Sequence, residues 1–159
     1  MLRNALLAGT ALVFTSAAYA QTMVKDIEVT TDLTAIENTK AAAYWANVSD
    51  DLEAAIAARL VDRLADDGAD IKVDVNELSL SNSFQSALGL EDAVLVGQVN
   101  ITHDSDNAKF DAYELTISAK AAQAYGENGM VLEGAFTDTP EYYAALVQAF
   151  ADGVVTRLK

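Results

Sequence analysis

The spacing of apolar side chains is most regular between residues 50 and 67, where it predicts an amphipathic helix. Apolar residues recur there at every third or fourth position, and charged residues fill the opposite side. The apolar stripe consists of Leu52, Ile56, Leu60 and Leu64, with Ala55 and Val61 beside it. Asp50 and Glu53 have the spacing of a capping box at the start of this helix, and Gly68 offers a left-handed stop after it.

A second amphipathic helix is predicted near the C-terminal end of the chain. Thr139 is the expected cap, and Pro140 stands at the first helical position, where proline is favoured. The apolar stripe of this helix, expected to pack against a sheet, consists of Tyr143, Leu146, Val147, Phe150, Val154 and Leu158. The alanine-rich segment 34–48 is expected to be at least partly helical.

Alternation of apolar and polar residues predicts strands at 23–33, 71–80, 93–103 and 110–119. The second of these strands changes phase along its length. Its apolar residues fall on odd positions as far as Val75 and on even positions from Leu78. Because a slip of one residue turns side chains to the other face of a sheet, a bulge is expected near Asn76 or Glu77. Segment 120–136 is left open between strand and loop.

The order strand, helix, three strands, helix predicts the α+β class. Each helix has one apolar stripe, so both are expected to cover one face of a roughly four-stranded, mostly antiparallel sheet in a two-layer sandwich. The first strand, the first helix and the strand at 71 form a β-α-β unit, whose connection is expected to be right-handed. Residues 21–159 contain no repeat or linker, which indicates a single domain.

Residues 1–20 are typical of a cleavable secretory signal peptide. Arg3 supplies a positive charge, residues 5–14 form an uncharged apolar run, and Ala18 and Ala20 place small side chains where signal peptidase reads them. The alternative is a membrane anchor, but the run is shorter than the roughly 20 apolar residues that a spanning helix needs. We therefore expect cleavage before Gln21 and a periplasmic or secreted protein.

Acidic residues outnumber basic residues in this chain by 24 to 10. Loss of the signal peptide would leave nine basic against 24 acidic side chains, a net charge of −15. Such a surface repels phosphates and anionic headgroups, so neither nucleic-acid binding nor stable membrane insertion after cleavage is expected. The acids are spread over the whole chain, which favours a role in solubility over the alternative, a surface that binds cations or a basic partner. The chain has no cysteine, which excludes a disulfide scaffold and lipidation at a cysteine.

The predicted helix, Gly68 and the strand Ile71–Val75 give the region from Leu52 to Leu80 an order of elements that resembles small accessory proteins of the bacterial cell envelope. Among these are the lipopolysaccharide-assembly lipoproteins and the auxiliary lipoproteins of ABC-type envelope transporters. The resemblance lies in architecture and implies an accessory role. It carries no functional residue over, and this chain departs from those families by lacking their lipidated cysteine.

Residues with catalytic or metal-binding potential form no complete motif. His103 is the only histidine, and no spacing sets a serine beside it, so we assign no catalytic residue. Asp104 and Asp106 resemble the opening of a calcium loop, but the later positions of that pattern are not filled. They remain weak candidates for cation binding, and no metal or cofactor is expected.

The segment 81–92 is unusually apolar for a predicted loop. Phe84, Leu88 and Leu90 stand there, with charges only at Glu91 and Asp92. These apolar side chains either fold back over the core or form an exposed patch that binds a partner.

Three functions are compatible with these features. The first is a non-catalytic periplasmic accessory or binding protein, whose partner is an unknown envelope protein or a small apolar ligand. The alternatives are a secreted hydrolase that uses carboxylates and His103, or a weak cation-binding protein. Convergence of His103 and acidic side chains in one pocket would favour the hydrolase.

Overall fold

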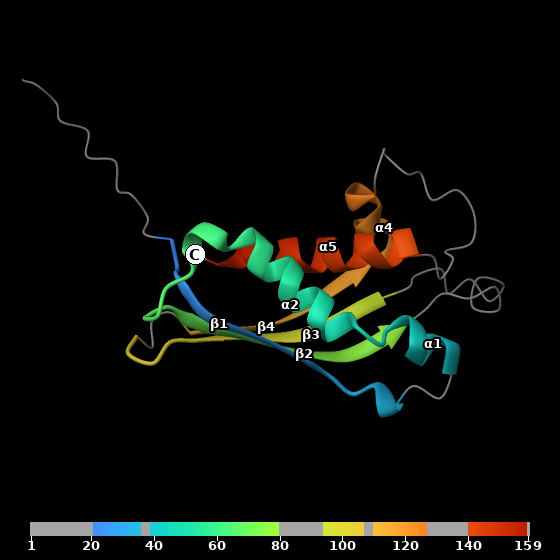
Figure 1. Ribbon diagram of the computed structural model, residues 1–159, viewed down its shortest axis with the longest axis horizontal. Coiled ribbons are helices and arrows are strands. Elements are labelled where there is room, and N and C mark those ends of the chain that lie inside the picture. The colour runs from blue at the N-terminus through green and yellow to red at the C-terminus, as the bar shows by residue number, and fades with distance from the viewer. Residues whose placement is uncertain (1–20, 36–38, 80–93, 107–109, 127–139, 159) are drawn as a thin grey trace, which may run out of the picture.

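The computed structural model describes residues 21–35, 39–79, 94–106, 110–126 and 140–158, whose strands form one four-stranded sheet (Figure 1). The strands are β1 (Val24–Thr31), β2 (Ala69–Ser79), β3 (Val94–Thr102) and β4 (Asp111–Ser118), and they lie side by side in chain order. β1 and β2 are parallel, while the β2–β3 and β3–β4 pairs are antiparallel. The predicted α+β class and order of elements are therefore confirmed.

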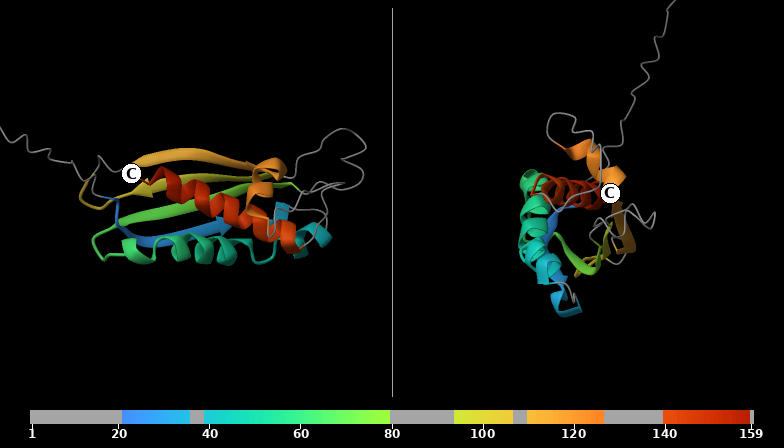
Figure 2. Two further views of the ribbon diagram at one scale, coloured as in Figure 1. Left: turned by 90° about the horizontal axis from the view of Figure 1, so that it is seen from above. Right: turned by 90° about the vertical axis from the view of Figure 1, so that its right-hand side faces the viewer.

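Two long helices, α2 (Val48–Arg59) and α5 (Pro140–Arg157), cover the same face of this sheet (Figure 2). The shorter elements are α1 (Thr39–Tyr44), α4 (Ala119–Ala122) and the 3₁₀ turns η1 (Leu33–Ala35), η2 (Val61–Arg63) and η4 (Gln123–Tyr125). Pro140 is the first residue of α5, as predicted, whereas its expected cap Thr139 lies outside the described residues. None of the described helices is both long and apolar enough to span a membrane.

The core lies between the helices and the sheet. Its fully buried side chains include Leu52 and Ile56 of α2, Leu146 and Phe150 of α5, and Ile71 of β2. On the opposite face of the sheet the strands carry mainly polar residues, such as Asp74, Gln98 and Glu114, with the buried Val96 as an apolar exception. The layer is therefore amphipathic, as the alternation predicted.

The pairing of β2 with β3 shifts by one residue between Val75 and Glu77, which confirms the predicted bulge. The shift lets the odd-numbered apolar residues before it and Leu78 after it pair with β3 residues on the same face of the sheet.

The prediction of a continuous helix over 50–67 is wrong. α2 starts at Val48 with Asn47 as its cap residue, and it ends at Arg59. Beyond it, Leu64 has an extended backbone and forms an isolated parallel bridge with Val24 at the start of β1. The Ala65 N–H donates to the Val24 carbonyl at 2.9 Å, so bonds to β1 replace the helical bonds that the periodicity predicted.

The roles predicted for Glu53 and Gly68 at the ends of the helix are also wrong. Glu53 accepts a hydrogen bond from the Val29 N–H at 2.9 Å and so satisfies an amide on the outer edge of β1. Gly68 lies well beyond the end of α2. A Cβ there would lie 2.5 Å from the Val24 carbonyl carbon, so the glycine is required by a close approach of two backbones.

The two long helices run in the same direction along the sheet. Asp51, in the first turn of α2, contacts Tyr143 near the start of α5, and Arg59, in the last turn of α2, reaches Gln148 further along α5. Parallel neighbours place like ends of two helix dipoles together. Acidic residues in both first turns, and Arg59 and Arg157 in the last turns, offset that cost.

Candidate functional site

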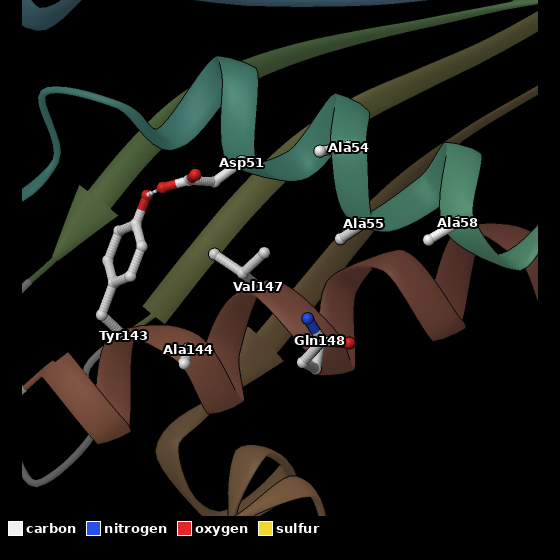
Figure 3. Close-up of a pocket in the computed structure, with 8 residues that line it drawn as sticks. All are labelled: Asp51, Ala54, Ala55, Ala58, Tyr143, Ala144, Val147 and Gln148. Carbon is white, nitrogen blue, oxygen red and sulfur yellow. Dashed lines mark hydrogen bonds between the residues drawn. The ribbon is translucent and has the colours of Figure 1, made fainter.

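A groove of about 400 Å³ runs between α2 and α5 on the outer side of the helical layer (Figure 3). We call it the helix groove. It is lined by Asp51, Ala54, Ala55, Ala58, Tyr143, Ala144, Val147 and Gln148. The small side chains of both helices account for the groove, because larger residues at these positions would fill the space between the two backbones.

The middle of the helix groove is apolar and open to solvent. Ala55 and Val147 form its buried floor, at 7% and 4% exposure, while Ala54, Ala58 and Ala144 are exposed along its sides. Ala54 and Ala58 are four residues apart and therefore lie on the same face of α2. The groove thus offers a smooth surface of methyl groups.

The end of the helix groove near the helix N-termini is polar and borders an aromatic cluster. The Tyr143 hydroxyl donates to Asp51 Oδ2 at 2.5 Å, and Figure 3 shows the two side chains reaching toward each other from their helices. The Tyr143 ring also contacts Tyr44 and Trp45, with centroid distances of 5.4 and 5.6 Å. Trp45 is fully buried, so this aromatic cluster ties Tyr143 to the core.

Near the opposite end of the groove, Arg59 links the two helices and already has bonding partners. The Arg59 guanidinium donates to the carbonyl oxygens of Ala55 at 3.0 Å and Gln148 at 3.1 Å, and it lies 3.7 Å from an Asp152 carboxylate oxygen. Asp152 also accepts a hydrogen bond from the Tyr125 hydroxyl at 2.8 Å. The charges at this end are therefore mutually satisfied, while Asp51 leaves the other end anionic.

A second groove of similar volume lies between β4 and α5. Leu115 and Ile117 of β4 form its floor, and Gly153 and Arg157 of α5 are on its other side. The Arg157 guanidinium stacks over the Tyr113 ring, 4.3 Å from its centroid. Leu115 and Ile117 belong to the core, so this groove marks the packing of α5 against the edge of the sheet.

The raised pKa values of the Tyr113 and Tyr143 phenols indicate that the folded protein loses stability in alkaline solution. Burial raises the pKa of Tyr113 from 10.0 to about 12, and burial together with the hydrogen bond to Asp51 raises the pKa of Tyr143. Because both phenols ionise less readily in the folded state, their contribution is complete below pH 10 and is lost as the pH rises through the folded pKa. For Tyr113 that loss occurs between about pH 10 and 12.

We expect the free energy of unfolding to fall across this range, and to fall less steeply in the double variant Tyr113→Phe, Tyr143→Phe. Denaturant titrations followed by circular dichroism, at several pH values on either side of 10, measure both slopes. Lysine ionisation contributes equally to both proteins and cancels in the comparison. Identical slopes would show that neither phenol is linked to folding.

The structure places His103 just after β3, outside both grooves. Its Nδ1 lies 3.3 Å from the Ser105 backbone nitrogen and 3.4 Å from the Ser105 hydroxyl. These contacts join residues two apart in a turn, and Ser105 is exposed. No convergence of His103 with acidic side chains in a pocket is seen among the described residues, so the hydrolase hypothesis gains no support from geometry.

The candidate cation ligands do not come together. Asp104 Oδ2 binds the Lys25 ammonium at 3.1 Å, and no group of three or more potential metal ligands occurs in the described part of the chain. Asp106 is half-buried at the following turn. The apolar residues Phe84, Leu88 and Leu90 lie outside the described residues, so the prediction of a partner surface there stays a prediction.

Sequence patterns did not reveal the helix groove. Periodicity places Tyr143 in the core stripe and predicts nothing for Asp51, because nothing in a single sequence pairs residues 92 positions apart. The available signal was the recurrence of alanine at positions 54, 55, 58 and 144 on two helices predicted to lie on the same sheet face. No protein-family model matches this chain, and no curated protein has a significant match to it.

Proposed function

We propose that this chain is a non-catalytic binding protein of the bacterial cell envelope, exported by its signal peptide, and that it contacts its partner through the helix groove. The observation that carries the proposal is the chemistry of the lining. It combines apolar methyl groups with three polar side chains, Asp51, Tyr143 and Gln148, which suit recognition by contact and hydrogen bonding. The signal-peptide pattern of residues 1–20 supports the proposed location.

The partner is either an envelope protein or a small apolar ligand. Both would bury Ala54, Ala58 and Ala144, whose exposed methyl groups lose no rotamer entropy on binding. The hydrolase and cation-binding alternatives have no comparable support, because the groove contains neither His103 nor Asp104.

Location and contact can be tested together in the producing cells. Mass spectrometry of protein purified from the periplasmic or secreted fraction should show Gln21, or its cyclised form, as the N-terminus. Because the chain has no native cysteine, Ala58→Cys gives one attachment point for a thiol-linked photocrosslinker in the groove. Ala112→Cys, at an exposed alanine on the sheet face that points away from the helices, is the matched control.

Crosslinks of defined mass at position 58 and not at position 112 would support the groove as the contact site. Equal labelling at both positions, or none at position 58 in cells that make the protein at native level, would contradict it. Recovery of the full chain with Met1 in the cytoplasm would contradict the envelope location.

A further inference from the structure

We propose that the helix groove receives a basic amphipathic helix of a partner protein, with apolar side chains on the alanines and a lysine or arginine at Asp51. This inference rests on the proposed function and identifies the chemistry of the partner. It is carried by three properties of the groove: its shape, its charge and its open side.

The shape of the groove fits a helix. Its two walls are themselves parallel helices, with Ala54 and Ala58 on one and Ala144 on the other. Residues without long side chains let a third backbone approach closely, and an amphipathic helix places its apolar side chains into such a groove at spacings of three and four. Val147 and Ala55 at the floor provide the buried contact for those side chains.

The charge of the groove selects a cationic partner. Asp51 is half-buried beside Asp50, and the Tyr143 hydroxyl binds only its Oδ2 atom. No cation among the described side chains is bonded to Asp51, whereas Arg59 at the other end is bound to two carbonyls and lies near Asp152. A lysine or arginine would therefore find an available carboxylate oxygen at one end only, which also sets the direction of the partner helix.

Other occupants fit less well. A second copy of this chain carries the same net charge, −14 for the full sequence and −15 after loss of residues 1–20, and repulsion between the two copies opposes pairing through this acidic surface. An alkyl chain would leave much of its surface in water, because Ala54, Ala58 and Ala144 are exposed along the open side. A helix in the groove keeps its polar side in water and buries only its apolar side.

The test uses a synthetic helical peptide of about four turns, with leucines on one side and lysines on the other. A peptide in which glutamate replaces every lysine is its counterpart. Trp45 is the only tryptophan of the chain and contacts Tyr143, so its fluorescence reports binding at the Asp51 end. We expect the lysine peptide to bind and the glutamate peptide to show no saturable binding.

Variants separate the groove from general attraction to an acidic protein. Asp51→Asn should weaken binding of the lysine peptide by about twofold to fivefold, as expected for a partly exposed charge pair. Asp74→Asn removes an exposed carboxylate from the sheet face that points away from the helices and should leave binding unchanged. Ala58→Phe should abolish binding while Ala112→Phe does not, with circular dichroism confirming that all variants are folded.

Equal effects of Asp51→Asn and Asp74→Asn would overturn the inference in favour of diffuse charge attraction. Binding of dodecyltrimethylammonium without binding of the peptide, or a dimer in sedimentation that Ala58→Phe dissociates, would overturn it in favour of those occupants. If crosslinking at position 58 still captures a partner when the peptide fails, the proposed function stands and only the basic helix is rejected. Failure of both removes the groove from the functional account.

Discussion

Gly68→Ala is expected to lower the free energy of unfolding by about 3 kcal/mol, because overpacking against a fixed backbone cannot be relieved by a rotamer change. A Cβ at position 68 would lie 2.6 Å from the Lys25 nitrogen and 2.7 Å from the Val24 Cα. The same backbones are joined by the hydrogen bond from the Ala69 N–H to the Met23 carbonyl, at 2.8 Å. Moving the two backbones apart to relieve the clash would disrupt this hydrogen bond at the start of β2.

Gly153→Ala is the matched control for this prediction. Gly153 lies inside α5, where alanine is favoured over glycine by about 1 kcal/mol. Its added Cβ would meet the end of the Leu115 side chain at 3.0 Å, and a flexible side chain can move. Urea titrations should therefore show a large loss for Gly68→Ala and a change of at most about 1 kcal/mol for Gly153→Ala. Comparable losses in the two variants would mean that a clash with a side chain lowers stability as much as a clash with the backbone.

The features that sequence predicted well are those set by local periodicity. The α+β class, the position of Pro140 in α5 and the bulge between Val75 and Glu77 follow from spacing within one element. The apolar residues of β4, Tyr113, Leu115 and Ile117, share one face of the sheet for the same reason.

The features that sequence missed depend on contacts between distant segments. Glu53 has the spacing of a capping residue, yet its carboxylate accepts a hydrogen bond from the Val29 amide on the outer edge of β1 instead of capping the helix. Gly68 has the spacing of a helix stop, yet its importance comes from Val24, 44 positions earlier. The helix groove is of the same kind, since Asp51 and Tyr143 meet only after both helices pack on the sheet.

Leu60 and Leu64 give the sharpest contrast between the periodic pattern and the folded chain. Both fall on the predicted apolar stripe, so the pattern alone expects equal losses when either leucine is truncated to alanine. In the structure Leu60 follows the last residue of α2 and is 0% exposed, whereas Leu64 is 50% exposed. The chain leaves the helix between them because residues 64 and 65 bond to β1.

Leu60→Ala is therefore expected to lower the free energy of unfolding by about 2–5 kcal/mol, the range for a leucine truncated inside a core. Leu64→Ala should cost about 1 kcal/mol or less, because half of that side chain is already in water. Asp62→Ala, on an exposed residue between them, should change stability by about 0.5 kcal/mol at most. Chemical denaturation of the three variants gives the ranking directly. Equal losses at positions 60 and 64 would mean that the helix continues to Asp67 and that the bridge to β1 does not form in solution.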